Sequence, residues 1–518
     1  MISMGTDISF AADQGSNRTE LNPPCLLGSG RDSKMDLTRK TKIVCTIGPV
    51  TESREMLARL MDSGMDVARI NFSHGSHERH RRVFGDMREL AGKKGRNLAI
   101  LCDIQGPKIR TGEMKEPFTL NTDDVLRVTE EEIMGSPERF TIDYPGLVDD
   151  LGVGDDIYIN DGIVKLRVTE KEDMDLVCVV RSGGLISDRK GCNIPGANLS
   201  VRVPTEKDRE DLKLISELEP EYIAASFIAD EIDVLAVRNF FKEQGSDGIK
   251  IISKIERPVA LRNLDDIIEV SDGIMVARGD LGVEIPPHEV PVWQKEMCRK
   301  CNRAGIPVIV ATQMLDSMTE HSRPTRAEAS DVFNAVIDGA DAVMLSNETS
   351  VGKHPVEAVE FMKDIVMTAE GEMPRRDPDY YDSSQQCVIE TIGHACYTIV
   401  KEFDDRNYSG KVLAITDSGQ SARMVSKYRP NRSIIAITPN RRTAREMNLV
   451  WGVAPIYSDD IDNTTLETRI LSSIASVFES GSVERKDRLI VISGSMEIGD
   501  EGMIVGIYNV GEVLKKMC

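Results

Sequence analysis

Two short apolar stretches of the chain run directly into charged residues. The stretch KIISKIE is closed by Lys254 and Glu256, and the stretch IMVARGDLG carries Arg278 and Asp280 at its polar end. Buried parallel strands are near-continuous apolar runs, and charges at their ends are costly unless a ligand or an ion meets them. Glu256 and Asp280 are hard oxygen ligands of the kind that Mg²⁺ uses beside substrate phosphates. With the positive charge of Lys254 beside them, the pattern indicates phosphoryl transfer.

Short apolar runs recur along the first two-thirds of the chain and predict the strands that position these residues. Amphipathic stretches such as Glu52–Ser63, Val234–Gln244 and Pro291–Arg303 separate most of them. Strands that alternate with helical stretches are typical of a parallel sheet, and eight such units predict a (β/α)8 TIM barrel. The predicted strands are Ile43–Ile47, Val67–Ile70, Leu98–Cys102, Tyr222–Ile228, Lys250–Ile255, Ile274–Ala277, Pro307–Thr312 and Ala342–Leu345.

The spacing of these units breaks once, between the third and fourth predicted strands. Residues 108–204 carry short strands separated by Gly, Pro, Asn and Asp, which is typical of a small all-β unit. We expect a β-barrel lid inserted after strand three, because loops at that face of a barrel surround the active site. Its predicted strands are Val125–Val128, Phe140–Asp143, Asp156–Asn160, Val164–Val168 and Leu176–Val180.

The pattern changes again near residue 370, which indicates a further domain. Gly371–Asp382 is short, charged and proline-bearing, as a linker would be, and Gln386–Phe403 has the pattern of a helix. The α/β alternation that follows predicts an open-sheet domain with strands at Val412–Thr416, Ser433–Thr438, Leu489–Ser493 and Met503–Asn509. The predicted domains are an N-terminal arm at 1–41, the barrel at 42–107 and 205–370, the lid at 108–204 and a C-terminal α/β domain at 371–518.

The net charge of −21 argues against general nucleic-acid binding, which needs a basic surface. The chain has no run of about 18 apolar residues, and residues 1–40 lack the apolar core of a signal peptide, so we expect neither a membrane span nor a leader. Its ten cysteines are scattered, several within apolar runs, which fits reduced thiols in the cytoplasm. Cys298 and Cys301 form a C-x-x-C pair, but no second pair exists, so we expect a packed helix face.

In a (β/α)8 barrel, the side chains at the C-terminal ends of the strands meet at one mouth. Five of the predicted strands end in polar groups suited to a phosphate, a divalent cation and a proton donor. One such group alone is commonly an ion pair within the fold, but five at one mouth favour an active site. They are Arg69, Asn71, Ser73 and His74 after strand two, Asp103 after strand three, Lys254 and Glu256 after strand five, Arg278 and Asp280 after strand six, and Thr312 and Gln313 after strand seven.

Several longer motifs resemble the pyruvate kinase family. They are IVCTIGP at 43–49, NFSHG at 71–75, IISKIE at 251–256, DGIMVARGDLG at 272–282, ATQML at 311–315 and RPTRAE at 323–328. The resemblance runs from about residue 42 to the C-terminus. It implies that the phosphoryl group of phosphoenolpyruvate passes to ADP, giving pyruvate and ATP in the final step of glycolysis.

The resemblance also implies roles for the residues at the mouth. Lys254 would lie against the transferring phosphoryl group and stabilise its charge. Glu256 and Asp280 would bind Mg²⁺ or Mn²⁺ together with the enolpyruvate oxygens. Arg69 would pair with the phosphate, and Thr312 would belong to the proton-relay end of the site.

Further residues would bind the rest of the two substrates. The backbone N–H groups that open a short helix would bind the substrate carboxylate; this set is Ala277, Arg278, Gly279 and Asp280. Asn71 and Arg110 would reach the nucleotide phosphates, and Lys190 would close on them from the lid.

This chain differs from many members of the family beside the expected monovalent-cation site. The K⁺ ligands of those members match Asn71, Ser73, Asp103 and the main-chain carbonyl of Ile104. However, Lys108 stands where K⁺-dependent members have a glutamate, and its ammonium could supply the positive charge of the ion. We therefore expect that K⁺ is not required.

The C-terminal domain carries a stretch similar to the effector loop of regulated members. In the sequence TDSGQS, the N–H groups and hydroxyls of Thr416, Ser418, Gly419 and Ser421 can cradle a phosphate. Asp417 adds an anion to this loop, and the segment 494–500 offers no cation. We therefore expect a sugar-monophosphate effector or a vacant loop rather than a response to fructose-1,6-bisphosphate. The family also implies a homotetramer.

Three histidines invite a metal interpretation. His74, His77 and His80 have a spacing that puts neighbours on one helix face. No Cys or Asp completes a tetrahedral set nearby in the sequence, so we expect helix-start packing and caps instead.

Two alternative functions use the same fold. Another barrel enzyme of enolpyruvate chemistry would need neither ADP nor a lid, so the insert and Lys190 argue against it. A non-catalytic scaffold would be expected to lose Lys254, Glu256 or Asp280, and all three are present.

Overall fold

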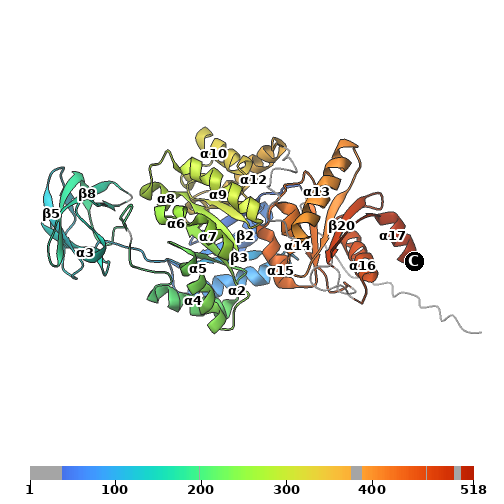
Figure 1. Ribbon diagram of the computed structural model, residues 1–518, viewed down its shortest axis with the longest axis horizontal. Helices are drawn as coiled ribbons and strands as arrows, with labels where there is room; N and C mark the ends of the chain where they lie inside the picture. The colour runs from blue at the N-terminus through green and yellow to red at the C-terminus, as the bar shows by residue number, and fades with distance from the viewer. Residues whose placement is uncertain are drawn as a thin grey trace, which may run out of the picture.

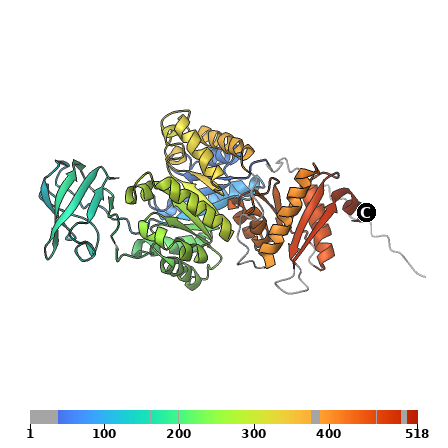
Figure 2. The same ribbon diagram turned by 45° about the horizontal axis from the view of Figure 1, so that its top comes forward.

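The computed structural model describes residues 38–160, 162–197, 199–374, 388–461, 464–494 and 503–517. The predicted N-terminal arm up to residue 37, most of the predicted linker and the segment 495–500 lie outside the described residues. Figures 1 and 2 show three lobes along one axis, with the lid at one end, the barrel in the middle and the C-terminal domain at the other end.

The predicted TIM barrel is confirmed: eight parallel strands close in the order β1-β16-β15-β14-β13-β12-β3-β2. The strands are β1 (Lys42–Ile47), β2 (Val67–Asn71), β3 (Ala99–Asp103), β12 (Tyr222–Ala225), β13 (Lys250–Ile255), β14 (Gly273–Ala277), β15 (Val308–Ala311) and β16 (Ala342–Leu345). The largest difference from the predicted bounds is in β12, which ends three residues before Ile228. The backbone leaves the strand there because Phe227 has a left-handed φ of 58°.

Helices between the strands cover the outside of the barrel (Figure 1). Several begin at capping residues; Thr205 and Thr325, for example, each form a capping box with an acidic residue three positions later. The helices are α1 (Arg54–Ser63), α2 (His77–Lys93), α4 (Glu206–Leu218), α5 (Glu231–Glu243), α6 (Pro258–Arg262), α7 (Leu264–Val270), α8 (Arg278–Glu284), α9 (Val290–Ala304), η1 (Asp316–Thr319), α10 (Arg326–Ile337), α11 (Asn347–Ser350) and α12 (Pro355–Gly371).

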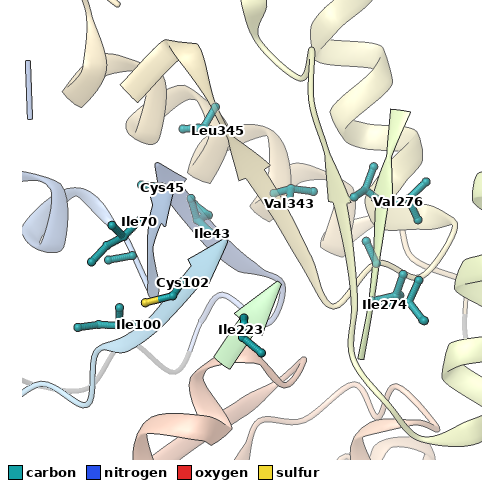
Figure 3. Packing of buried hydrophobic residues seen from close by; sticks show 14 of the residues in the cluster. Ile43, Cys45, Ile70, Ile100, Cys102, Ile223, Ile274, Val276, Val343 and Leu345 are labelled. Carbon is teal, nitrogen blue, oxygen red and sulfur yellow. The ribbon is translucent and has the colours of Figure 1, made fainter. Parts of the chain in front are cut away.

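Each barrel strand is buried on both faces because successive side chains point to opposite sides. In β1, Ile43 and Cys45 belong to the outer core under the helices, and Val44 belongs to the inner core. Figure 3 shows members of the outer core on several strands, including Ile100 and Val276. This packing fixes the strand ends, and with them the side chains at the mouth.

The predicted all-β lid follows β3, as expected. Its described residues form a six-stranded sheet in the order β11-β7-β8-β9-β5-β6 and a two-stranded sheet of β4 and β10, around one hydrophobic core. The elements are β4 (Phe118–Leu120), β5 (Val125–Thr129), β6 (Arg139–Thr141), α3 (Leu147–Asp150), β7 (Asp156–Ile159), β8 (Val164–Lys171), β9 (Asp175–Ser182), β10 (Gly184–Ile186) and β11 (Cys192–Asn193).

The C-terminal domain is the predicted open α/β sheet, with strand order β19-β18-β17-β20-β21. The sequence did not predict β19, which contains Pro455. Proline is confined mostly to edge strands, and β19 lies at the edge of this sheet. The elements are α13 (Val388–Asp405), β17 (Lys411–Ile415), α14 (Gln420–Ser426), β18 (Ile434–Thr438), α15 (Arg441–Glu446), η4 (Met447–Leu449), β19 (Val453–Tyr457), α16 (Leu466–Glu479), β20 (Arg488–Gly494), β21 (Met503–Asn509) and α17 (Val510–Met517).

This domain packs on the barrel end opposite the mouth. Leu449 is fully buried within the inner core of the barrel. Nearby, the guanidinium of Arg429 makes a buried ion pair with Asp341 at 2.8 Å, and the Lys42 ammonium donates to the Val453 carbonyl. The mouth itself therefore stays open toward the lid.

Candidate active site

A cleft of about 200 Å³ lies between the barrel mouth and the base of the lid. It is lined by barrel residues, among them Asp280 and Glu284, and by residues of the connection into the lid, among them Lys108 and Arg110. The predicted residues at the strand ends lie at this same end of the barrel because all eight strands are parallel.

Lys254 is the centre of a buried polar network at the mouth. Its Nζ donates to Ser226 Oγ at 2.7 Å and lies 3.3 Å from Asp103 Oδ1 and 2.9 Å from Glu256 Oε1. Burial alone would lower the pKa of the ammonium, but the carboxylates of Asp103 and Glu256 outweigh burial and raise the pKa of Lys254 above its usual value. Lys254 is therefore a permanent positive charge at the mouth.

Glu256 is buried beside Lys254, and each of its oxygens has one partner. Its Oε2 accepts a hydrogen bond from the backbone N–H of Phe227 at 2.6 Å. Its Oε1 lies 2.9 Å from Lys254 Nζ. Burial raises the pKa of Glu256, Lys254 opposes that rise, and the nearby Asp280 adds to it. A buried carboxylate with a second carboxylate nearby is suited to a divalent cation.

Asp280 supplies the second carboxylate. It lies in the first turn of α8, lines the cleft, and acts electrostatically on both Lys254 and Glu256. Two hard carboxylates at a site open to substrate fit Mg²⁺ or Mn²⁺, which keep water and substrate oxygens among their ligands. Within the described ranges, no group of three or more His, Cys, Asp or Glu side chains could hold a metal, so the two do not form a complete protein cage.

Arg69 is held at the mouth by Asp103. Its Nε donates to Asp103 Oδ2 at 2.7 Å, and its Nη1 donates to Thr46 Oγ1 at 3.0 Å. Burial would raise the pKa of Asp103, but Arg69 and Lys254 on either side hold the pKa below its usual value. Asp103 thus fixes both cations that could meet a phosphate.

Thr312 links the end of β15 to the start of α8. Its hydroxyl accepts a hydrogen bond from the Gly279 N–H at 2.7 Å and donates to the Ala311 carbonyl at 2.6 Å. Both Thr312 and the next residue, Gln313, have left-handed backbones, with φ of 70° and 54°. The Arg278 side chain contacts the same turn, because its Nη2 donates to the Thr312 carbonyl at 2.7 Å.

Two of the groups expected around K⁺ lie opposite each other, because Asn71 of β2 pairs with Asp103 of β3. Asn71 Oδ1 accepts from the Ser73 N–H at 3.0 Å, and the Ile104 carbonyl accepts from the Ser226 hydroxyl at 2.7 Å, beside Asp103. The charges that act most strongly on Asp103 are those of Arg69 and Lys254.

Lys108 lies at the barrel mouth, near the segment that carries the predicted K⁺ ligands Asn71 and Ser73. It lines the cleft and acts on His74, where burial, then Lys108, Arg110 and Arg69, lower the pKa of the imidazole. The mouth is therefore rich in positive charge on the side where nucleotide phosphates are expected.

The residues expected to reach the nucleotide differ in placement. Arg110 lines the cleft. Lys190 pairs through its backbone with Thr111, at 2.8 and 2.9 Å, and the neighbouring Arg189 is the one that lines the cleft. Arg189 also forms an ion pair with Glu113 at 3.0 Å.

The other two histidines of the triplet have partners of their own. His77 Nε2 lies 2.7 Å from Asp211 Oδ1. His80 stacks on Phe72 with ring centroids 4.3 Å apart, and burial, reinforced by Arg79, lowers the pKa of His80 to about 4.

The effector-like loop is structured around its own residues. The Thr416 hydroxyl accepts from the Gly419 N–H at 2.9 Å, and Gly419 has a positive φ of 80°. The Ser421 hydroxyl is buried without a hydrogen-bond partner. Asp417 pairs with the buried Arg469 at 2.9 Å, a cation 52 residues away that the sequence did not connect with this loop. The segment 495–500 lies outside the described residues.

Several residues of the site were missed by sequence reasoning. Ser226 and Phe227 contact Lys254 and Glu256, but the predicted fourth strand ran through them. Asn193 of the lid donates to Glu284 of the barrel at 2.9 Å, and no sequence signal connects those two positions.

Comparisons with known proteins show which family this chain resembles along most of its length. A family model described as "Pyruvate kinase, barrel domain" matches residues 38–359, and "Pyruvate kinase, alpha/beta domain" matches residues 390–504. A pyruvate kinase of Staphylococcus epidermidis is 42% identical over 484 residues, covering 92% of this chain and 82% of its own length. One of Geobacillus stearothermophilus is 42% identical over 487 residues, covering 93% and 82%. The crystal structure of a pyruvate kinase from Cryptosporidium parvum superposes with a TM-score of 0.85 at 36% identity, covering 93% of this chain and all of that one.

Proposed function

The chain belongs to the pyruvate kinase family, and from that premise we propose how its barrel mouth moves a phosphoryl group from phosphoenolpyruvate to ADP. The observation that carries the assignment of roles is the Lys254 ammonium, buried 2.9 Å from Glu256 Oε1, with Asp280 nearby. Lys254 is the charge that stabilises the phosphoryl group in flight, because a fixed cation in a water-poor site stabilises developing negative charge most strongly.

Arg69 and the loop before α8 bind the rest of phosphoenolpyruvate. Arg69 is fixed by Asp103 and pairs with the phosphate. The backbone of 277–280 binds the carboxylate, which must share the Gly279 N–H with the Thr312 hydroxyl. This attachment orients the phosphoryl group toward the nucleotide side of the cleft.

The divalent cation belongs to Glu256 and Asp280. The nearness of these two hard carboxylates at the cleft supports this assignment. When bound, Mg²⁺ or Mn²⁺ supplies charge neutralisation for the phosphoryl and enolate oxygens. The chain's own part is to orient the two carboxylates, and Lys254 and the Phe227 N–H favour the ionised form of Glu256 against the effect of burial.

Thr312 serves proton delivery to the methylene carbon of the enolate. In the structure its hydroxyl donates a hydrogen bond to the Ala311 carbonyl. Proton transfer through Thr312 therefore requires the hydroxyl to rotate away from that carbonyl while Gly279 still holds its oxygen.

The nucleotide phosphates are assigned to Asn71, Arg110 and the lid residue Lys190. The positive charge around His74 supports this side of the cleft as the anion site. Lys190 does not line the cleft in this structure, so its role depends on movement of the lid toward the barrel.

Finer properties follow from the same resemblance. Lys108 replaces the family's glutamate, and we propose activity without K⁺. The pairing of Asp417 with Arg469 leaves a loop suited at most to a monophosphate effector.

A homotetramer in the cytoplasm is the expected form, and the buried, reduced state of the described cysteines is compatible with that compartment. None of the helices in the described part of the chain is long and apolar enough to cross a membrane.

The direct test is a purified-protein assay with phosphoenolpyruvate, ADP and Mg²⁺, in which ATP and pyruvate are measured separately. We expect equal amounts of both products and no phosphoenolpyruvate consumption without ADP. Consumption without ATP formation would instead favour another enolpyruvate enzyme.

A further inference from the structure

The turn after β15 has an uncommon backbone. Thr312 and Gln313 are consecutive residues with φ of 70° and 54°. L-residues rarely adopt this region, and a β-branched residue such as threonine does so only when its surroundings impose it. Something in the structure must therefore hold Thr312 in place.

The Arg278 guanidinium contacts this turn from α8. Its Nη2 donates to the Thr312 carbonyl at 2.7 Å, and its Nε donates to the Ala311 carbonyl at 3.3 Å. On its other side, Nη1 lies 2.7 Å from Asp331 Oδ1 and 3.3 Å from Gln294 Oε1. Its side chain is only 10% exposed. The planar guanidinium presents several donors in a fixed geometry, so it can hold two successive carbonyls at once.

Two independent links thus connect the start of α8 with Thr312. Arg278 holds the backbone carbonyl, and the next residue, Gly279, holds the hydroxyl through its N–H at 2.7 Å. The hydroxyl position depends on the backbone conformation, because χ1 of threonine is stiff. A relaxed backbone at Thr312 would move the hydroxyl away from Gly279.

We propose that Arg278 is a positioning residue for proton delivery: its guanidinium holds the Thr312 turn in the left-handed conformation that aims the hydroxyl. The inference rests on the proposed function, in which Thr312 serves the enolate carbon. The Arg278 guanidinium is occupied by the turn, Asp331 and Gln294, and the proposed function assigns the charge of the transferring phosphoryl group to Lys254 on β13. Its loss should therefore slow protonation more than phosphoryl transfer.

The two steps can be measured separately. In protonation, the electron pair of the enolate carbon takes a proton to form the methyl C–H bond while the carbonyl is restored. In the reverse direction a methyl C–H bond of pyruvate breaks and its proton is lost to solvent. Exchange of pyruvate methyl hydrogens in D₂O with MgATP, followed by NMR, reports this step, and ATP formation from phosphoenolpyruvate and ADP reports phosphoryl transfer.

The variants are Arg278→Gln, Thr312→Ala and the double variant, with Arg238→Gln as the matched control. Arg238 also binds a carbonyl and a carboxylate, those of Val270 and Asp272, but near the start of β14, away from the mouth. We expect Arg278→Gln to lower exchange relative to ATP formation by on the order of 10-fold or more, and Arg238→Gln to leave this ratio unchanged. Because Arg278 acts through Thr312, the double variant should have the ratio of Thr312→Ala alone.

Two results would overturn the proposal. One is an Arg278→Gln enzyme in which exchange and ATP formation fall together while Thr312→Ala lowers exchange selectively. The other is a double variant in which the two effects on the ratio add. A Thr312→Ala enzyme with an unchanged ratio would instead remove the proposed role of Thr312 itself, and this inference with it. If Arg278→Gln does not fold, Asp331→Asn replaces it as the test, because it removes the carboxylate that holds the guanidinium from its solvent side. Asp331→Asn should lower the ratio of exchange to ATP formation by a smaller factor. An unchanged ratio in this variant would count against the proposal.

Discussion

The Lys254 ammonium and the Glu256 carboxylate lie 2.9 Å apart in the barrel mouth, and the second oxygen of Glu256 accepts from the Phe227 N–H. A buried ion pair offsets its desolvation only when its remaining donors and acceptors are satisfied. Here the Lys254 ammonium also meets the Ser226 hydroxyl and the Asp103 carboxylate, so each of its three N–H groups faces an oxygen. The network thus holds a fixed positive charge and a buried carboxylate side by side at the mouth, which is the arrangement that the proposed phosphoryl transfer uses.

Removing either carboxylate should weaken metal binding. Glu256→Gln and Asp280→Asn each delete a hard anionic ligand, so the Mg²⁺ concentration for half-maximal rate should rise by about tenfold or more. The measurement is a Mg²⁺ titration of initial rate at saturating substrates. Asp272→Asn is the control, because Asp272 pairs with Arg238 near the start of β14. Unchanged titrations in both mouth variants would refute the metal assignment.

Potassium should not be needed for activity. Lys108 adds a positive charge to the mouth where K⁺-dependent members have a glutamate, and Lys108→Glu should make the enzyme depend on K⁺. Initial rates in K⁺ and tetramethylammonium salts at equal ionic strength test this. A wild-type enzyme that is nearly inactive until K⁺ is added would contradict it.

His80 should make stability depend on pH. The pKa of His80 is lowered to about 4 by burial from a usual 6.5, so between these values the unfolded chain binds more protons than the folded one. The free energy of unfolding should therefore fall as pH drops through this window, by up to about 1.4 kcal/mol per pH unit from this group. Urea unfolding between pH 4 and 6.5 measures this pH dependence in the wild type and in His80→Gln. The His80→Gln variant should show a flatter dependence.

His77→Gln is the control for that experiment, because His77 lies on the same helix but is half exposed. The account of His80 is wrong if His80→Gln and wild type lose stability in parallel over the same pH range.

The strands of the barrel could be predicted because apolar runs of fixed spacing are what a parallel barrel buries. The end of β12 could not be predicted, because the turn there depends on the left-handed backbone of Phe227. Such a turn is predicted from sequence mainly where a glycine is present, and this position has none. β19 was missed because Pro455 argues against a central strand, and only the sheet order reveals that it is an edge.

For the site, Lys254, Glu256, Asp280 and Arg69 could be proposed from the sequence. Each lies at or just after the end of a predicted strand, and phosphoryl transfer needs cations and carboxylates together at the barrel mouth. The sequence could not predict partners that come from distant segments. Arg278 with the turn at Thr312 and Asp417 with Arg469 are pairs that only the folded chain brings together.

The most direct test of the central claim is the turnover of Lys254→Met compared with Lys250→Met. Both lysines lie on β13, but Lys250 is at its opposite end, 3.5 Å from Asp272. If Lys254 stabilises the transferring phosphoryl group, Lys254→Met should lower kcat by about 10³-fold or more. Circular dichroism should show that the variant is folded, and Lys250→Met should remain within a few-fold of wild type. A folded Lys254→Met enzyme that keeps more than about a tenth of wild-type kcat would contradict the account.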